Sequence, residues 1–164
     1  MWGVAFSHDG KNVLSTSSDG TVRCWDLQTA APLHCFDAKT PVHAIVLSRD
    51  GKQALISCDE GPVRLLDLVT WTEIRRFLGP VKPAWGAVFS PDGKWVLAGS
   101  EDTSLRLWDF ESGKQLRRFQ RHTKTVTGVA FSPDGRYAVS GGDDNTLRLW
   151  AMPEPDADGP AKAR

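Results

Sequence analysis

The chain of 164 residues lacks an excess of charge of either sign and lacks long hydrophobic runs. Its 20 Lys and Arg residues balance its 20 Asp and Glu residues, whereas a general nucleic-acid binder usually carries the basic excess that neutralises phosphates. No uninterrupted apolar run is longer than four residues, against the roughly 20 that a membrane-spanning helix needs. We therefore expect a globular protein that binds neither nucleic acid nor a membrane.

Cysteine is also scarce, and the start of the chain carries no targeting signal. Cys24, Cys35 and Cys58 are an odd number at no metal-ligand spacing, which favours a reducing compartment over a disulfide framework. The first six residues lack a charged segment and a small-residue cleavage site, so no secretory signal is visible. These features together predict a cytoplasmic protein.

Metal and cofactor motifs are missing as well. His8, His34 and His43 share no spacing typical of zinc sites. The pair Gly141-Gly142 stands without the further glycines and the lysine of a phosphate-binding loop. We expect no metal and no cofactor.

What the chain does contain is a repeated turn of the form Ser-x-Asp-Gly. Its glycines are 41, 42 and 42 residues apart, at Gly10, Gly51, Gly93 and Gly135. A second landmark lies 15 residues beyond each glycine, at Trp25, Leu66, Trp108 and Trp150. Two landmarks in register show an internal repeat, and a period of this length decides the fold class.

Within each period, apolar residues alternate with period two, as Leu105 and Leu107 do around Arg106, which indicates short strands. Ser-Pro-Asp-Gly suits a tight hairpin because Pro presets the backbone angle at the second position and Gly accepts the left-handed angle that closes the turn. Further turn-forming segments divide the rest of each period. We predict an all-β chain of four-stranded antiparallel meanders.

These residues resemble the WD40 repeat family. The pattern Phe-Ser-Pro-Asp-Gly, a strand, and then a segment close to Asp-x-Thr-Leu-Arg-Leu-Trp-Asp is legible in three of the four periods. The second period has drifted, with Leu66 in the tryptophan position and Pro62 in that of the Thr. The resemblance covers residues 2–152 and implies a β-propeller with one blade per repeat. The expected repeats are about 2–41, 42–83, 84–125 and 126–152.

The propeller implied by the resemblance is incomplete. The Pro-rich segment after Trp150 cannot form a fourth strand, so the last blade is expected to lack its outer strand. Residues 153–164, rich in Pro, Asp and Ala, are expected to be a disordered tail. The chain is thus expected to be either the C-terminal part of a larger propeller or a half-ring that self-associates to complete it.

The family also carries a hydrogen-bond network of His, Ser or Thr, Asp and Trp inside each blade. Only the fourth repeat has it whole, as His122, Ser140, Asp144 and Trp150, while Ala38 is assigned to the His position of the first repeat. Ser, His and Asp also suggest a catalytic triad. A blade interior is no cleft, however, and a network that satisfies its own buried donors and acceptors accounts for the same residues.

An arginine recurs two positions before each tryptophan landmark, at Arg23, Arg64, Arg106 and Arg148. One arginine at the same place in every blade suggests a stripe that binds phosphates. We expect instead that their stems cover apolar surface while their charged heads remain in water.

In the resembled family, two positions of each repeat point to the top face near the mouth of the channel, where partners bind. The residues at the start of the innermost strands are Trp2, His43, Trp85 and Thr127. The residues just before the network Asp position are Ser18, Asp59, Glu101 and Asp143. Amphipathic rings beside carboxylates are typical of an interaction hot spot, although two of the rings, those of Trp2 and Trp85, can equally serve to fill space between blades.

The resemblance implies a non-catalytic scaffold that binds a protein or peptide through this top face. The alternative is the C-terminal sensor or scaffold region of a larger signalling enzyme, for example a protein kinase, whose catalytic domain lies outside this chain. A self-contained enzyme is not predicted, because nothing in the sequence brings a nucleophile, a base and oxyanion donors together.

Overall fold

The computed structural model describes residues 1–79 and 82–153, and the described residues form fifteen β-strands and no α-helix. The first sheet contains β1 (Gly3–Phe6), β2 (Asn12–Thr16), β3 (Thr21–Asp26) and β4 (Pro32–Asp37). The second contains β5 (Val42–Leu47), β6 (Gln53–Cys58), β7 (Val63–Asp67) and β8 (Thr72–Phe77). The third contains β9 (Ala84–Phe89), β10 (Trp95–Ser100), β11 (Ser104–Asp109) and β12 (Gln115–Gln120). The fourth contains β13 (Val126–Phe131), β14 (Tyr137–Gly142) and β15 (Leu147–Ala151).

Each sheet is an antiparallel meander in which strands that follow one another in the sequence are paired. The first three sheets have four strands, and the last has three. The expected all-β fold, with a last blade that lacks its outer strand, is therefore confirmed. In the part of the chain that the structure describes, no helix is long and apolar enough to cross a membrane.

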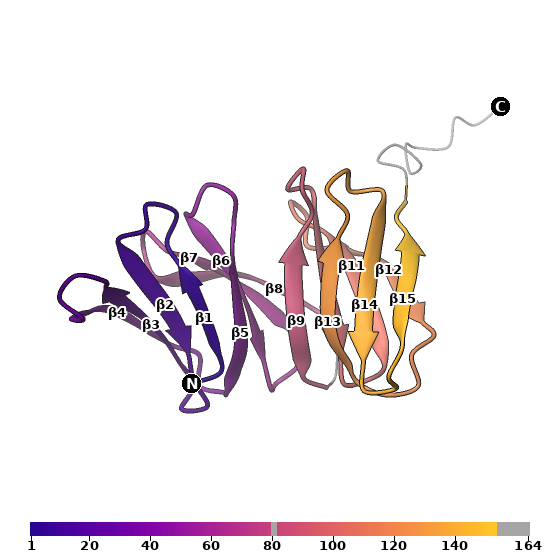
Figure 1. Ribbon diagram of the computed structural model, residues 1–164, viewed down its shortest axis with the longest axis horizontal. Helices are drawn as coiled ribbons and strands as arrows, with labels where there is room; N and C mark the ends of the chain where they lie inside the picture. The colour runs from indigo at the N-terminus through magenta and orange to yellow at the C-terminus, as the bar shows by residue number, and fades with distance from the viewer. Residues whose placement is uncertain (80–81, 154–164) are drawn as a thin grey trace.

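The four sheets stand side by side in an open arc (Figure 1). Their first strands form the inner edge, where β1 contacts β5, β5 contacts β9, and β9 contacts β13. The later strands of each sheet lie further out, with β4 at one end of the view and β15 near the other (Figure 1). Among the described residues, this arrangement leaves one sheet face uncovered at each end of the arc.

The repeated turns explain why the strands begin and end where they do. In the second sheet, the Ser48 hydroxyl donates to Asp50 Oδ1 at 2.6 Å, and Asp50 Oδ1 also accepts the Lys52 N–H at 3.1 Å. Gly51 closes the turn with φ of 69°, a left-handed angle that is costly for other residues. The same contacts recur in the other three turns, so this part of each blade is specified locally.

The core consists of three apolar clusters, each between two neighbouring sheets. In the third cluster, Leu97, Leu105 and Leu107 of the third sheet are fully buried against Trp150 and Ala138 of the fourth. Full burial of one such leucine contributes about 1.5–3 kcal/mol. Because each sheet is covered by its neighbours alone, stability is shared along the arc as it is in other repeat proteins.

The expectation for the arginine stripe was wrong at two positions. Arg64 and Arg106 are only 4% and 5% exposed. Arg64 donates to the carbonyl of Ala38 at 2.9 Å, and Arg106 donates to Asp102 at 2.7 Å. Each side chain lies against the segment that precedes its blade: Arg64 contacts Ala38, and a Cβ on Gly79 would lie 3.2 Å from Cδ of Arg106. In the described structure no sheet stands before the first one, and the side chain of Arg23 in that sheet is 42% exposed.

The contact of Ala38 also corrects its assignment. Ala38 lies between β4 and β5 and contacts Arg64 of the second sheet, so it occupies the His position of the second blade rather than the first. Apart from its first residue, the tail expected over residues 153–164 lies outside the described residues.

Candidate functional site

Three residues of the predicted top face are the extra residues of β-bulges. In β5, Val42 and Ala44 are paired with β6, whereas His43 between them is not. The same irregularity leaves Trp85 unpaired in β9 and Thr127 unpaired in β13. A bulge bends the strand and re-aims the side chain of the extra residue. Three sheets therefore present a side chain from the same position of the innermost strand.

The second predicted set lies beside these bulges. In three blades, the residue of this set donates its backbone N–H to the carbonyl of the residue two places before the bulged one. The distances are 3.1 Å from Asp59 to Pro41, 3.0 Å from Glu101 to Pro83 and 2.9 Å from Asp143 to Thr125. Each of the three bulges thus has an acidic residue held next to it by the backbone.

Three rings of the top face form one cluster. The imidazole of His43 lies 4.5 Å from the Trp2 ring and 4.4 Å from the Trp85 ring, and the two indoles are 6.1 Å apart, centroid to centroid. His43 Nε2 pairs with the carboxylate of Asp59. His43 is buried, but Trp2 is 52% exposed, so the cluster offers an apolar surface with a carboxylate at its edge.

Two polar atoms of this cluster have no hydrogen-bond partner in the described part of the chain. These atoms are Nδ1 of His43 and Nε1 of Trp85, and both are buried. A buried polar atom without a partner costs stability. The cluster is therefore not optimised for internal packing alone.

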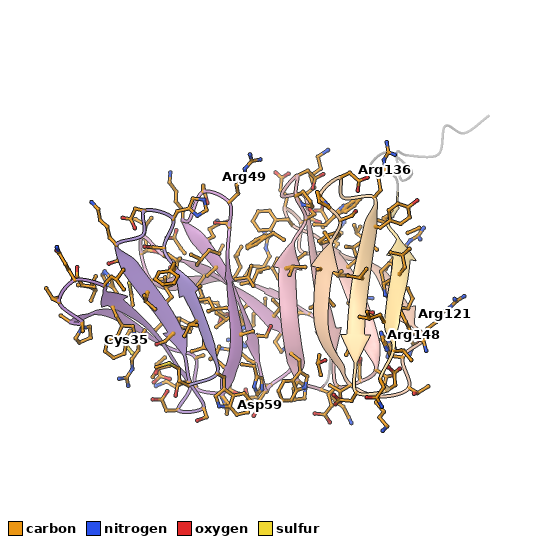
Figure 2. All side chains as sticks on the ribbon, viewed as in Figure 1. Cys35, Arg49, Asp59, Arg121, Arg136 and Arg148 are labelled. Atoms are coloured by element: carbon orange, nitrogen blue, oxygen red, sulfur yellow. The ribbon has the colours of Figure 1, made fainter. Side chains whose placement is uncertain are left out.

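The remaining top-face residues are placed around the cluster rather than in it. Glu101 pairs with Lys82 at 3.3 Å, and Thr127 donates to the carbonyl of Gly141 at 3.4 Å. Ser18 and Asp143 are exposed. Asp59 is at the lower edge of the view in Figure 2, the end at which Figure 1 marks the N-terminus, opposite Arg49 and Arg136.

The fourth blade contains a continuous chain of side-chain hydrogen bonds. The Trp150 indole donates to Ser140 Oγ at 2.8 Å, and Ser140 Oγ lies 2.7 Å from His122 Nε2. His122 Nδ1 lies 2.9 Å from Asp144 Oδ2. One arrangement of hydrogens satisfies every member, with the serine hydroxyl donating to Nε2 and Nδ1–H donating to the carboxylate.

The carboxylate at the end of this chain is strongly stabilised. Burial alone would raise the pKa of Asp144. Donation by the Thr123 N–H, the Thr146 hydroxyl and His122 outweighs burial and holds that pKa well below its usual range. Ser140 is 1% exposed and its oxygen already accepts the Trp150 N–H, so the chain of bonds fixes the blade and offers no accessible nucleophile.

The other blades replace parts of this network in different ways. In the first blade, the Trp25 indole donates to Ser15 Oγ at 2.8 Å. In the third, Ala98 occupies the serine position, and the Trp108 indole donates instead to the carbonyl of Leu78 at 2.8 Å. A backbone carbonyl as the substitute partner was not predicted from the sequence.

The bulges were not predicted either, although the sequence contains one signal for them. Gly86 follows Trp85, and Gly128 follows Thr127. An isolated glycine inside a strand pattern is typical of a bulge or of close backbone approach. In β9, a Cβ on Gly86 would lie 3.4 Å from the Thr127 carbonyl oxygen of the neighbouring sheet.

The arc of four-stranded antiparallel sheets, joined along their first strands, defines part of a β-propeller. The family model described as WD domain, G-beta repeat, matches residues 1–26, 71–109 and 113–151. The chain belongs to the WD40 repeat family. No curated protein matches the chain. WD40 repeats generally serve as scaffolds for protein interaction.

Proposed function

We propose that this chain is a non-catalytic WD40 scaffold that binds a protein or peptide through its top face. The observation that carries the proposal is the recurrence of a β-bulge at the same position of three innermost strands. Each bulge aims one side chain beside an acidic residue of the next hairpin. Repetition of this device in three blades supports a continuous recognition surface.

The chemistry of the surface favours a peptide with apolar or cationic side chains. The half-exposed Trp2 ring offers area for stacking, and aromatic rings attract cations as well as apolar groups. Asp59 and Asp143 are exposed on the hairpins beside the His43 and Thr127 bulges. Tryptophan anchors surrounded by polar groups dominate the energetics of many interfaces.

The test uses peptides selected from a displayed library against the native chain. Their affinities are then measured for the variant with Trp2→Ala and Glu101→Lys. We expect binding to weaken at least about tenfold, the effect of losing 1.4 kcal/mol. The matched control is Arg49→Ala with Arg136→Ala, at the opposite edge of the molecule (Figure 2). If the peptides bound more weakly only to the arginine variant, recognition would lie at the opposite edge, and the proposal would be contradicted.

Two further features belong to the proposal. A reducing, cytoplasmic setting is supported by Cys24, Cys35 and Cys58, which are all free thiols. Self-association of the chain to complete a propeller is a separate proposal, because it would use the sheet faces at the ends of the arc rather than the top face.

A further inference from the structure

The last sheet exposes an apolar face that corresponds to a buried face in the sheet before it. Val139, Leu147 and Leu149 are 44%, 83% and 68% exposed. The residues one repeat of 42 earlier are Leu97, Leu105 and Leu107, and each of these is 0% exposed. We call the exposed trio the Leu149 face.

The first sheet exposes its other side, the side that packs against a preceding sheet in the later blades. Val4 and Phe6 are 65% and 67% exposed. Phe6 is paired across the sheet with Val13, and Val13 with Trp25, so this row of side chains shares one side of the sheet. We call it the Phe6 face. In the next sheet, Ile45 stands in the position of Val4 and is 6% exposed.

Every sheet-to-sheet contact in the chain joins these two kinds of face. In the contact between the third and fourth sheets, Leu97 and Leu107 pack against Ala138 and Trp150, which are the fourth-sheet equivalents of Val13 and Trp25. In the contact between the first and second sheets, Leu14 packs against Ala54 and Leu66 in the same way. In the part of the chain that the structure describes, the arc ends with one uncovered face of each kind.

The backbones of the innermost strands also pack in one direction along the arc, with a glycine of one sheet against the next sheet. A Cβ on Gly3 would lie 3.1 Å from the His43 carbonyl oxygen, and one on Gly86 would lie 3.4 Å from that of Thr127. Gly128 is the equivalent glycine of the last sheet, and a Cβ there would meet nothing within 4 Å in the described structure. By the repeat, the carbonyl expected beside Gly128 is that of Trp2 in a further sheet.

We propose that the Leu149 face of one copy of this chain docks onto the Phe6 face of a second copy. Two copies joined through both pairs of faces form a ring of eight blades, within the usual range of about 4–8. The occupant is a second copy because the chain itself carries both complementary faces, and the contact continues three interfaces already present in it. Closing both contacts at once makes the second one intramolecular.

The docking also joins the two top faces. The repeat relation sets Trp2 of one copy beside Thr127 and Gly128 of the other. The bulge residues would then continue from one chain to the next around the channel. This inference does not depend on peptide binding, since it rests on the two sheet faces.

The experiment measures the mass of the full chain by size-exclusion chromatography with light scattering. The native chain is expected at twice its 18.0 kDa mass. Leu147→Lys with Leu149→Lys removes one face, and Val4→Lys with Phe6→Lys removes the other. Each variant alone should be a monomer, because a contact needs one intact face of each kind.

The equimolar mixture of the two variants gives the sharpest outcome. One intact Leu149 face and one intact Phe6 face remain, so a dimer held by a single contact should form. A native chain that is monomeric at every concentration, variants that still dimerise alone, or a mixture that stays monomeric would each overturn the proposal. A native chain whose measured mass keeps rising with concentration, beyond that of a dimer, would overturn the closed ring.

Circular dichroism establishes that the variants keep their β-structure. If a lysine pair prevents folding, the single changes Leu147→Ser and Val4→Ser replace it, because both residues are more than half exposed. The same mixing experiment then applies. A single change that folds and still dimerises as the native chain does would count against the proposal.

Discussion

The imidazole of His43 stacks on the indole of Trp85, with ring centroids 4.4 Å apart and 26° between the ring planes. The two residues occupy the same bulged position in consecutive repeats. Their contact shows that the bulges of adjacent blades aim their side chains toward one another along the inner edge of the arc. A partner that binds there would contact several blades at once.

The hydrogen-bond chain of the fourth blade should make a measurable contribution to stability. His122→Ala removes the imidazole that links Ser140 to Asp144, although Ser140 still accepts the Trp150 N–H and Asp144 the Thr146 hydroxyl. We expect a loss of about 1–3 kcal/mol in the free energy of unfolding, measured by urea denaturation. His8→Ala is the matched control, because His8 is exposed. Equal losses for the two variants would contradict the role assigned to His122.

The repeat relation predicts effects of very different size for the same substitution in neighbouring blades. Leu107→Ala empties a fully buried position and should cost about 2–5 kcal/mol. Leu149→Ala, one repeat later, changes a side chain that is 68% exposed and should cost less than about 0.5 kcal/mol.

Both leucine variants are best compared in the Val4→Lys, Phe6→Lys background, which removes pairing between copies. Chemical denaturation of monomers then reports burial within one chain. A large loss for Leu149→Ala in that background would mean that its face is covered by the chain itself.

The low pKa of Asp144 predicts part of the acid sensitivity of the chain. A carboxyl whose pKa is lower in the folded state stabilises folding above its unfolded pKa, near 3.8. That contribution is lost as the pH falls below this value toward the folded pKa. Denaturation midpoints measured from pH 5 to strongly acidic conditions should therefore fall less steeply for Asp144→Asn than for the native chain. Parallel curves would contradict the prediction.

The three thiols should react at very different rates. Burial raises the pKa of Cys58 to about 11 and also raises that of Cys24, so both are almost entirely protonated at pH 8. Cys35 is exposed. A disulfide reagent should titrate one thiol rapidly in the native chain and all three after unfolding. Cys35→Ser should remove the rapid phase, and its persistence would mean that a buried thiol is accessible.

Much of the fold was predictable because its signals are local. The turn from Ser48 to Gly51 closes through its own side chains and its own glycine, so its sequence identifies it without reference to the rest of the chain. The alternation of apolar residues fixes which side of each strand faces a neighbour. The hydrogen-bond network of His122, Ser140, Asp144 and Trp150 was identified through the WD40 resemblance.

The surroundings of the candidate site were less predictable. The sequence indicated which residues begin the innermost strands, but not that His43, Trp85 and Thr127 are bulged. A bulge depends on how two strands pair, and alternation along a single strand does not report pairing. The glycines after two of these residues were the one local sign.

The sequence by itself determined the repeat, the strand order within each sheet and the turns, because these depend on residues close together in the chain. Only the tertiary structure decided that Arg64 and Arg106 are buried, that the Trp108 indole bonds a backbone carbonyl, and that Leu149 is exposed where Leu107 is not. Residues with the same local pattern meet different environments because burial depends on whether another sheet stands next to them, and position along the arc sets that.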